Sequence, residues 1–138
     1  MVIIMEKPRS HCPIAFALDV FGDRWSLLIL RDIIFKGKRH YSEFIGSEEK
    51  ISTNILASRL EHLEGAGLIV RSGDEKDRKR IVYQPTKKAL DLVPVMLEMV
   101  LWSATYDSNT AAPRSFVKRA KTDRKRLIEE IRKVFEPQ

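Results

Sequence analysis

The stretch "ISTNILASRLEHLEGAGLIVR", residues 51–71, has the pattern of an amphipathic helix followed by a short strand. Its apolar side chains recur at three- and four-residue steps, as on one face of a helix: Leu56, Leu60 and Leu63. Ser52 suits the N-cap position, and Gly67 suits the C-terminal end. The polar side of this helix carries small uncharged groups, where Glu and Lys would solvate a helix better.

These small groups are suited to the major groove of DNA. With the leucines inward, the 3.6-residue period turns Asn54, Ser58 and Glu61 directly outward. Asn can pair with adenine, Ser and Thr can bond to bases or phosphates, and small side chains let the backbone come close. We therefore predict a DNA-recognition helix with these contact residues: Ser52, Thr53, Asn54, Ala57, Ser58 and Arg59.

Two short apolar runs follow, "LIVRS" (68–72) and "RIVYQ" (80–84), joined by the charged segment 73–79. This pattern predicts a β-hairpin with a charged tip. The tip could lie along the phosphate backbone or in the minor groove through its cations, Lys76, Arg78, Lys79 and Arg80. The alternative is a solvated finger whose own acidic residues, Asp74, Glu75 and Asp77, neutralise those cations. Next to the small-residue helix, the DNA interpretation is favoured.

The remaining elements complete a recognisable order. Helices are predicted over 13–21, over 24–37 with Asp23 as cap, over 40–45, from Thr86 to 107 with a kink at Pro94, and over 114–135. A linker, "SNTAAP" (108–113), precedes the last helix, whose apolar side consists of Phe116, Ala120, Leu127, Ile131 and Val134. The order is that of a winged helix-turn-helix: mainly α with a small β-hairpin. We expect a winged domain over 1–108 and a linker with a basic helix over 109–138.

Composition narrows the function classes. The 138 residues are 43% hydrophobic and 32% charged, which fits one globular domain, and the net charge of +6 favours a polyanionic partner. The start, "MVIIMEKPRS", lacks signal-peptide features, and charges interrupt the apolar runs, so we expect a cytoplasmic protein with no membrane span. His11, His40 and His62 lack metal-ligand spacing, and no phosphate loop or paired carboxylates stand out. We therefore predict no metal, no cofactor and no enzyme activity.

Four segments together resemble the HxlR family of bacterial transcriptional regulators. They are "CPIAFALDVFGDRWSLLILRDI", "GKRHYSEF", "ISTNILASRLEHLEGAGLI" and "VYQPTKKALDLVPVMLEMVLW", which span residues 12 to about 102. The resemblance implies a homodimer, formed through the N-terminal helix and the C-terminal helices, that presents two recognition helices to a pseudo-palindromic operator. It also implies a transcriptional regulator, with repression the favoured action. The sequence departs from the family pattern at 85–88, and the basic helix from Arg114 extends past the family core.

Cys12 is the candidate sensor residue. It stands before Pro13 at a helix start, where free N–H groups favour a thiolate, and His11 and Arg9 are possible positive neighbours. Some HxlR-type regulators use a cysteine in this Cys-Pro position as a redox or electrophile switch. The alternative is an apolar cysteine buried at the dimer interface. Both interpretations stay open.

Two other function classes compete with DNA binding. The hairpin and the basic tail could serve an interaction or RNA-binding module, but the small polar face of the 51–63 helix argues against it. A thiol enzyme could be built on Cys12, but no third group is present to orient a base.

Overall fold

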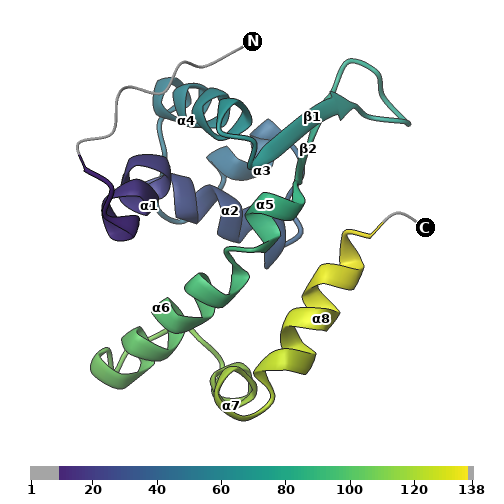
Figure 1. The fold of residues 1–138 in the computed structure, drawn as a ribbon. Helices are drawn as coiled ribbons and strands as arrows, with labels where there is room; N and C mark the ends of the chain where they lie inside the picture. Colours follow the sequence, from purple (N-terminus) through teal and green to yellow (C-terminus); the bar gives the residue numbers. More distant parts are fainter. Residues whose placement is uncertain (1–9, 137–138) are drawn as a thin grey trace. The chain divides into compact units, whose positions relative to one another are not determined.

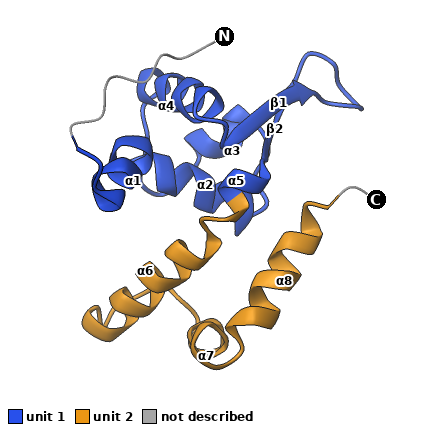
Figure 2. Ribbon diagram, in the orientation of Figure 1, with its two compact units in different colours: residues 1–89 blue, residues 90–138 orange. Residues whose placement is uncertain are grey.

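The computed structural model describes residues 10–136. The chain forms two compact units that divide between residues 89 and 90 (Figure 2). The division expected at 108/109 was placed at the linker that precedes the last helix, and it stays a prediction.

The first unit holds four helices followed by a hairpin and a short helix (Figure 1). Their bounds are α1 Pro13–Phe21, α2 Ser26–Ile34, α3 Tyr41–Ile45, α4 Thr53–Gly65, β1 Ile69–Gly73, β2 Ile81–Pro85 and α5 Lys87–Leu90. The predicted order of helices and strands is therefore confirmed. The second helix is shorter than predicted, since it ends at Ile34 instead of near Gly37. Asp23 holds its start as expected, by accepting from the amides of Trp25 and Ser26.

The hairpin is antiparallel, with Arg71 opposite Tyr83 and Gly73 opposite Ile81. Tyr83 is buried and packs edge-on against Phe44 of α3, with 5.9 Å between ring centroids. This contact fixes which face of the hairpin points toward the helices. Arg71, as the cross-strand partner of Tyr83, shares that face.

The core of the first unit is apolar and includes the predicted stripe of α4. Leu56, Leu60 and Leu63 are all buried. They join the other fully buried apolar side chains of the unit, which include Leu30, Ile33, Phe44, Leu68 and Ile69. The packing leaves the opposite face of α4 open to solvent.

A buried carboxylate holds the turn that precedes α4. Asp32 of α2 is 3% exposed and accepts hydrogen bonds from Arg31, at 2.8 and 3.0 Å, and from the Ser47 hydroxyl. Lys38 Nζ lies 3.4 Å from Asp32 and donates to Ser47 Oγ at 2.7 Å. Arg31 also binds Glu49 through two 2.8 Å bonds. Because Ser47 and Glu49 belong to the turn, this network fixes the turn on α2.

The second unit holds α6 Val93–Tyr106, α7 Arg114–Thr122 and α8 Arg124–Val134. Two predicted helices are thus divided. The helix expected from Thr86 is broken between α5 and α6, because Pro94 occupies the first turn of α6 and cannot continue a preceding helix. The helix expected over 114–135 is broken at Asp123, whose φ of −138° and ψ of 34° leave the helical region. Asp favours such boundary positions over helix interiors.

The apolar side of the basic helices packs within their own chain. Ala120 and Leu127 are buried, and Phe116 and Ile131 are half-buried. Val134 lies on the same side of α8 by helical period, but it stands at the end of the helix and is 70% exposed. Ion pairs support the packing, with Arg124 bound to Glu98 and Arg132 bound to Asp91 at 2.9 Å. These ion pairs join α8 to α6 and to the residues just before α6 within the same chain.

One segment, Lys87–Tyr106, is long and apolar enough to cross a membrane by length and composition alone. The break between α5 and α6 leaves 14 residues in the longer piece. At about 1.5 Å per residue, such a helix is about 21 Å long, short of a hydrocarbon core of about 30 Å.

Candidate nucleic-acid interface

The open face of α4 carries five of the six predicted recognition residues. Ser52, Thr53, Asn54, Ala57 and Ser58 are all exposed. The Ser52 side chain caps the helix by accepting from the Ile55 amide at 3.3 Å. The first turn is also held by Tyr41 of α3, whose hydroxyl donates to the Thr53 carbonyl at 2.9 Å. The structure thus brings together a contiguous face of short polar groups at the start of the helix.

Arg59 differs from the other five because it is half-buried and engaged. Its Nη1 lies 3.5 Å from Asp23, the carboxylate that caps α2. Burial would raise the pKa of Asp23, but hydrogen bonds from Ser26 and Trp25 and the charge of Arg59 together lower it. Arg59 therefore ties α4 to the start of α2, and its contact with DNA stays a prediction.

A second tie runs from α4 to α1. The Nε2 atom of His62 lies 2.6 Å from the carbonyl oxygen of Val20. The flank of α4 that carries His62 is therefore turned toward α1.

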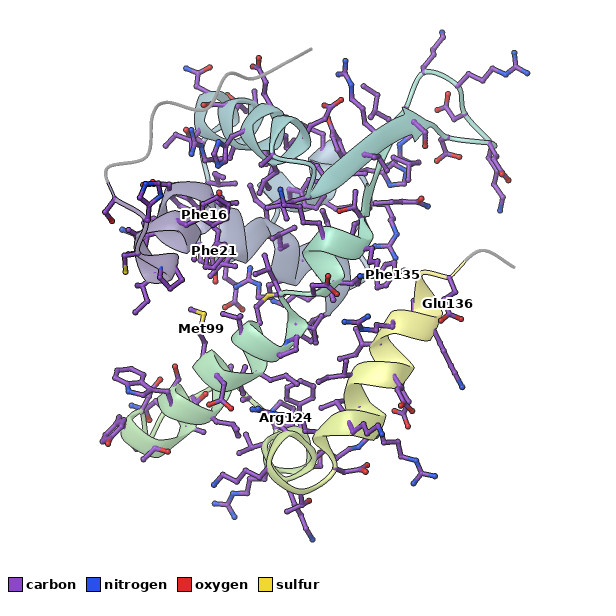
Figure 3. The ribbon with its side chains drawn as sticks, viewed as in Figure 1. Phe16, Phe21, Met99, Arg124, Phe135 and Glu136 are labelled. Carbon is purple, nitrogen blue, oxygen red and sulfur yellow. The ribbon has the colours of Figure 1, made fainter. Side chains whose placement is uncertain are left out.

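The four predicted hairpin cations, Lys76, Arg78, Lys79 and Arg80, are all exposed at the tip. Figure 3 shows the side chains of this loop spread into solvent. The acidic residues of the tip bind backbone instead: Asp74 accepts from the Lys76 amide at 2.8 Å, and Asp77 accepts from the Lys79 amide at 3.1 Å. Within residues 10–136, none of the four cations forms an ion pair. The acidic residues thus shape the turn and leave the cations available.

His40 links the hairpin to α3, a role that the sequence did not suggest. Its Nδ1 lies 2.9 Å from Glu43 and its Nε2 lies 3.0 Å from Asp74, at the base of the hairpin tip. Bonds from the Lys76 amide and from His40 lower the pKa of Asp74. The spacing of His40 and Glu43 is that of a capping box, which a sequence can show. The bond to Asp74 spans 34 residues, and no local pattern predicts it.

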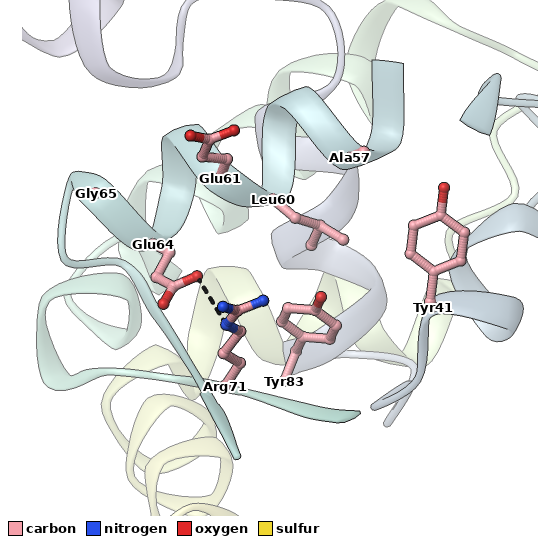
Figure 4. A pocket seen from close by; sticks show the side chains of 8 residues that line it. All are labelled: Tyr41, Ala57, Leu60, Glu61, Glu64, Gly65, Arg71 and Tyr83. Atoms are coloured by element: carbon pink, nitrogen blue, oxygen red, sulfur yellow. Dashed lines mark ion pairs between the residues drawn. The ribbon is translucent and has the colours of Figure 1, made fainter. Parts of the chain in front are cut away.

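A cleft of about 360 Å³ separates the second half of α4 from the hairpin (Figure 4). Its floor includes the buried side chains Leu60 and Tyr83. Arg71 projects into it from β1 and lies 3.6 Å from Glu64 of α4. Burial raises the pKa of the Tyr83 phenol. Arg71 therefore places a guanidinium beside α4, which only the strand register could have indicated.

Cys12 is the N-cap of α1 and is exposed. Its amide donates to Ser10 Oγ at 3.3 Å, and its carbonyl accepts from the Phe16 amide at 3.0 Å. His11 is also exposed, while Arg9 lies outside the described residues. The thiol is thus accessible in a single chain.

Both units expose large apolar side chains. On α6 they recur at steps of four, three and four residues: Val95, Met99, Trp102 and Tyr106. In Figure 3, Met99 projects away from α7 and α8. On α1 the exposed apolar side chains are Ile14, Phe16 and Leu18. A stripe of exposed apolar side chains such as that of α6 is a mark of a protein–protein interface.

Known proteins share this arrangement. The profile of the HxlR-like helix-turn-helix family matches residues 20–111. An HTH-type transcriptional regulator of Synechocystis, sll1512, is 33% identical over 88 residues, which make up 64% of each chain. The match thus spans just under two thirds of that relative's length. The Bacillus subtilis regulator YdeP is 32% identical over 95 residues, covering 69% of this chain and 73% of YdeP. Neither relative has been characterised.

Solved structures agree with the sequence matches. PA1607, a candidate transcription factor, superimposes with a TM-score of 0.68 at 34% identity, over 77% of this chain and 74% of PA1607. The oxidised form of the redox regulator HypR gives 0.62 at 26% identity, over 70% and 99%. The reduced form of the Bacillus subtilis transcriptional regulator YodB gives 0.58 at 26% identity, over 73% and 99%. The fold is a winged helix-turn-helix, and this chain belongs to the HxlR-like helix-turn-helix family of transcriptional regulators.

Proposed function

We propose that the protein is a homodimeric transcriptional repressor of the cytoplasm that binds a pseudo-palindromic operator in double-stranded DNA. The observation that carries the proposal is the open face of α4, which presents the short polar groups of Thr53, Asn54 and Ser58 over its first two turns, beside Ala57 and the part-exposed Ile55. A helix enters the major groove with such a face, and its N-terminal residues contact base edges.

Each of the six predicted contact residues has a role in the proposed complex. Asn54 pairs with an adenine edge, and Ser58 bonds to a base one turn further along. Ser52 and Thr53 lie at the N-terminus of the helix, where free amides favour a phosphate. Ala57 lets the helix backbone approach the groove. Arg59 contributes through its bond with Asp23, which orients α4, as well as through phosphate attraction.

The hairpin supplies the sequence-independent part of binding. Lys76, Arg78, Lys79 and Arg80 lie along the phosphates or in the adjacent minor groove. Support comes from the acidic residues of the tip, which bind backbone amides and leave the cations unpaired within the described residues. His40 anchors the base of this tip on α3.

The dimer interface consists of the exposed apolar stripe of α6 together with α1. Burial of Met99, Trp102 and Tyr106 by a partner would remove large side chains that are at least half exposed in one chain. Such an isologous contact generates two-fold symmetry, which an operator mirrors by two half-sites about 34–36 Å apart.

Cys12 is proposed as a thiol switch of this dimer. The support is its exposure at the start of α1 and the likeness of the chain to HypR, a redox regulator, and to YodB, which has been studied after diamide treatment. The chain has one cysteine, so the switch would be an intersubunit disulfide, a mixed disulfide or an adduct. Modification beside the interface would change the spacing of the two recognition helices.

Selection of bound duplexes from a random pool tests the DNA proposal. We expect a short palindromic consensus, and Asn54→Ala should weaken binding to it by about 1–3 kcal/mol while leaving random DNA nearly unaffected. Enrichment of single-stranded RNA in a parallel pool, with no duplex consensus, would instead favour the RNA-binding alternative.

Diamide tests the switch on the same consensus duplex. It should change the affinity of the wild type and not that of Cys12→Ser. Equal responses of the two proteins would remove Cys12 from regulation while leaving DNA binding intact.

A further inference from the structure

The second unit contains a groove with one basic wall, and the residues of that wall come after the region that the family profile matches. The groove lies between the C-terminal end of α6, the loop that follows it, and α7, and its volume is about 450 Å³. Its polar lining includes Asp107, Ser108, Thr110, Arg114, Lys118 and Lys121. The family profile ends at residue 111. The helix that supplies the cations therefore lies beyond the region that the family profile matches.

The cations of this groove are arranged as a row. Arg114, Lys118 and Lys121 follow one another at steps of four and three residues, which puts them on one side of α7. All three are exposed, and within residues 10–136 none of them forms an ion pair. The row is thus uncompensated.

Other basic residues of the two C-terminal helices are used differently. Arg119 binds Asp123 and Glu130, Arg124 binds Glu98, and Arg132 binds Asp91. These arginines hold the helices together. The paired arginines therefore stabilise the second unit, whereas the cations of the row form no ion pair within residues 10–136.

The rest of the lining suits anionic oxygens. The hydroxyls of Ser108 and Thr110 can donate hydrogen bonds at the loop side of the groove. One carboxylate, Asp107, also lines it, but its Oδ1 already accepts from the Asn109 amide at 2.9 Å. Three cations against one carboxylate leave the groove positive.

We propose that this groove binds the phosphodiester backbone of duplex DNA, as a contact surface in addition to α4 and the hairpin. The inference rests on the proposed function. The row runs over seven helical steps, from Arg114 to Lys121, about 10.5 Å along the helix axis. Its three long, flexible side chains can therefore each contact a phosphate of one DNA strand.

Two matched triple variants of the full chain test the groove. The first replaces Arg114, Lys118 and Lys121 with Gln. The second replaces Lys125, Arg126 and Lys133 with Gln, which removes the same number of Arg and Lys from exposed positions of α8, outside the groove. A third variant, Arg114→Lys with Lys118→Arg and Lys121→Arg, keeps the charge. Circular dichroism melting checks that all three stay folded.

The readout is the dependence of duplex affinity on salt between about 50 and 200 mM. Each lost phosphate contact should flatten the log–log slope by about 0.9, so the groove variant should lose about 2–3 units per chain, with its sequence preference unchanged. The α8 variant should change by less than about one unit, and the charge-keeping variant should match the wild type. Equal losses from both triples, or an unchanged slope in the groove variant, would overturn the groove while leaving the proposed function in place. Absence of duplex binding by the wild type would overturn the proposed function and this inference with it.

Discussion

Two single variants, Asp32→Asn and Glu49→Gln, compare the loss of a buried charge with the loss of a more exposed charge in the same network. Both changes are nearly isosteric, and both remove an acceptor charge from Arg31. Asp32 is 3% exposed and binds Arg31, Lys38 and Ser47, whereas the Glu49 side chain is 32% exposed and binds Arg31 alone among these. Both variants turn a carboxylate into an amide, so a difference in their stability reflects the burial of the carboxylate and the number of its partners.

The Asp32 variant should be the more damaging. Breaking a buried charge cluster by removing one partner costs about 3–5 kcal/mol. The side chains of Arg31 and Lys38 are about a fifth exposed, so water can partly replace the lost bonds, and the lower end of that range, about 3 kcal/mol, is expected. For a unit of this size, such a loss lowers the melting temperature by about 10 °C or more.

The Glu49 variant should cost less than about 1 kcal/mol. The hydrogen bonds from Arg31 lower the pKa of Glu49 from 4.5 to about 2. In full, that shift would correspond to about 3 kcal/mol, but solvent screening at an exposed side chain reduces it to about 1 kcal/mol. Because the folded-state pKa is lowered, this stability is present above pH 4.5 and is lost as the pH falls from 4.5 toward 2.

Urea unfolding at pH 7 and at steps down to pH 2.5 measures both effects, with duplex affinity at pH 7 as a second readout. Because the network holds the turn before α4, the Asp32 variant should also lose DNA affinity under conditions where it is folded. Equal destabilisation by the two substitutions at pH 7 would refute the reasoning from burial. A Glu49→Gln protein whose stability falls between pH 4.5 and 2.5 as steeply as the wild type's would refute the assigned source of acid sensitivity.

Two further predictions concern DNA and the dimer. Replacing Arg78 and Arg80 with Ala should weaken binding to all duplexes alike and flatten the salt dependence by about 0.9 per lost phosphate contact; an unchanged slope in salt titrations would mean that the hairpin tip is only solvated. Replacing Met99 and Trp102 with Lys should convert the dimer to monomers in analytical ultracentrifugation with little change in helix content, because both side chains are exposed in the single chain; a variant that stays dimeric would exclude the α6 stripe as the interface.

The sequence predicted the fold wherever the pattern was local. The leucine stripe of α4, its cap at Ser52 and the hairpin follow from period and spacing, and the structure confirms them. The predictions of two long helices were wrong in their bounds, because a single residue interrupts each segment. Pro94 begins a helix instead of kinking one, and Asp123 interrupts a segment whose apolar period runs on past it.

The candidate site was predictable only in part. The helical and strand periods predict which side chains are buried or exposed, but they do not predict which residues bond to one another. Five α4 residues and four hairpin cations are exposed as expected. The bonds of Arg59 to Asp23 and of His40 to Asp74 join residues that are 34 or more positions apart. Such contacts depend on how elements meet in space, which helical and strand periods do not specify.

The way α4 is attached explains why these distant polar bonds matter for function. Only three residues of its 13 are buried, since most of its surface is open for a partner. A helix with so little packed surface can rock about its leucine stripe unless directional bonds restrain it. Tyr41 holds its first turn, Arg59 its middle and His62 its last turn, each through a different neighbouring segment. Loss of one such bond leaves the leucines packed, so it should reduce operator affinity more than it reduces the stability of the fold.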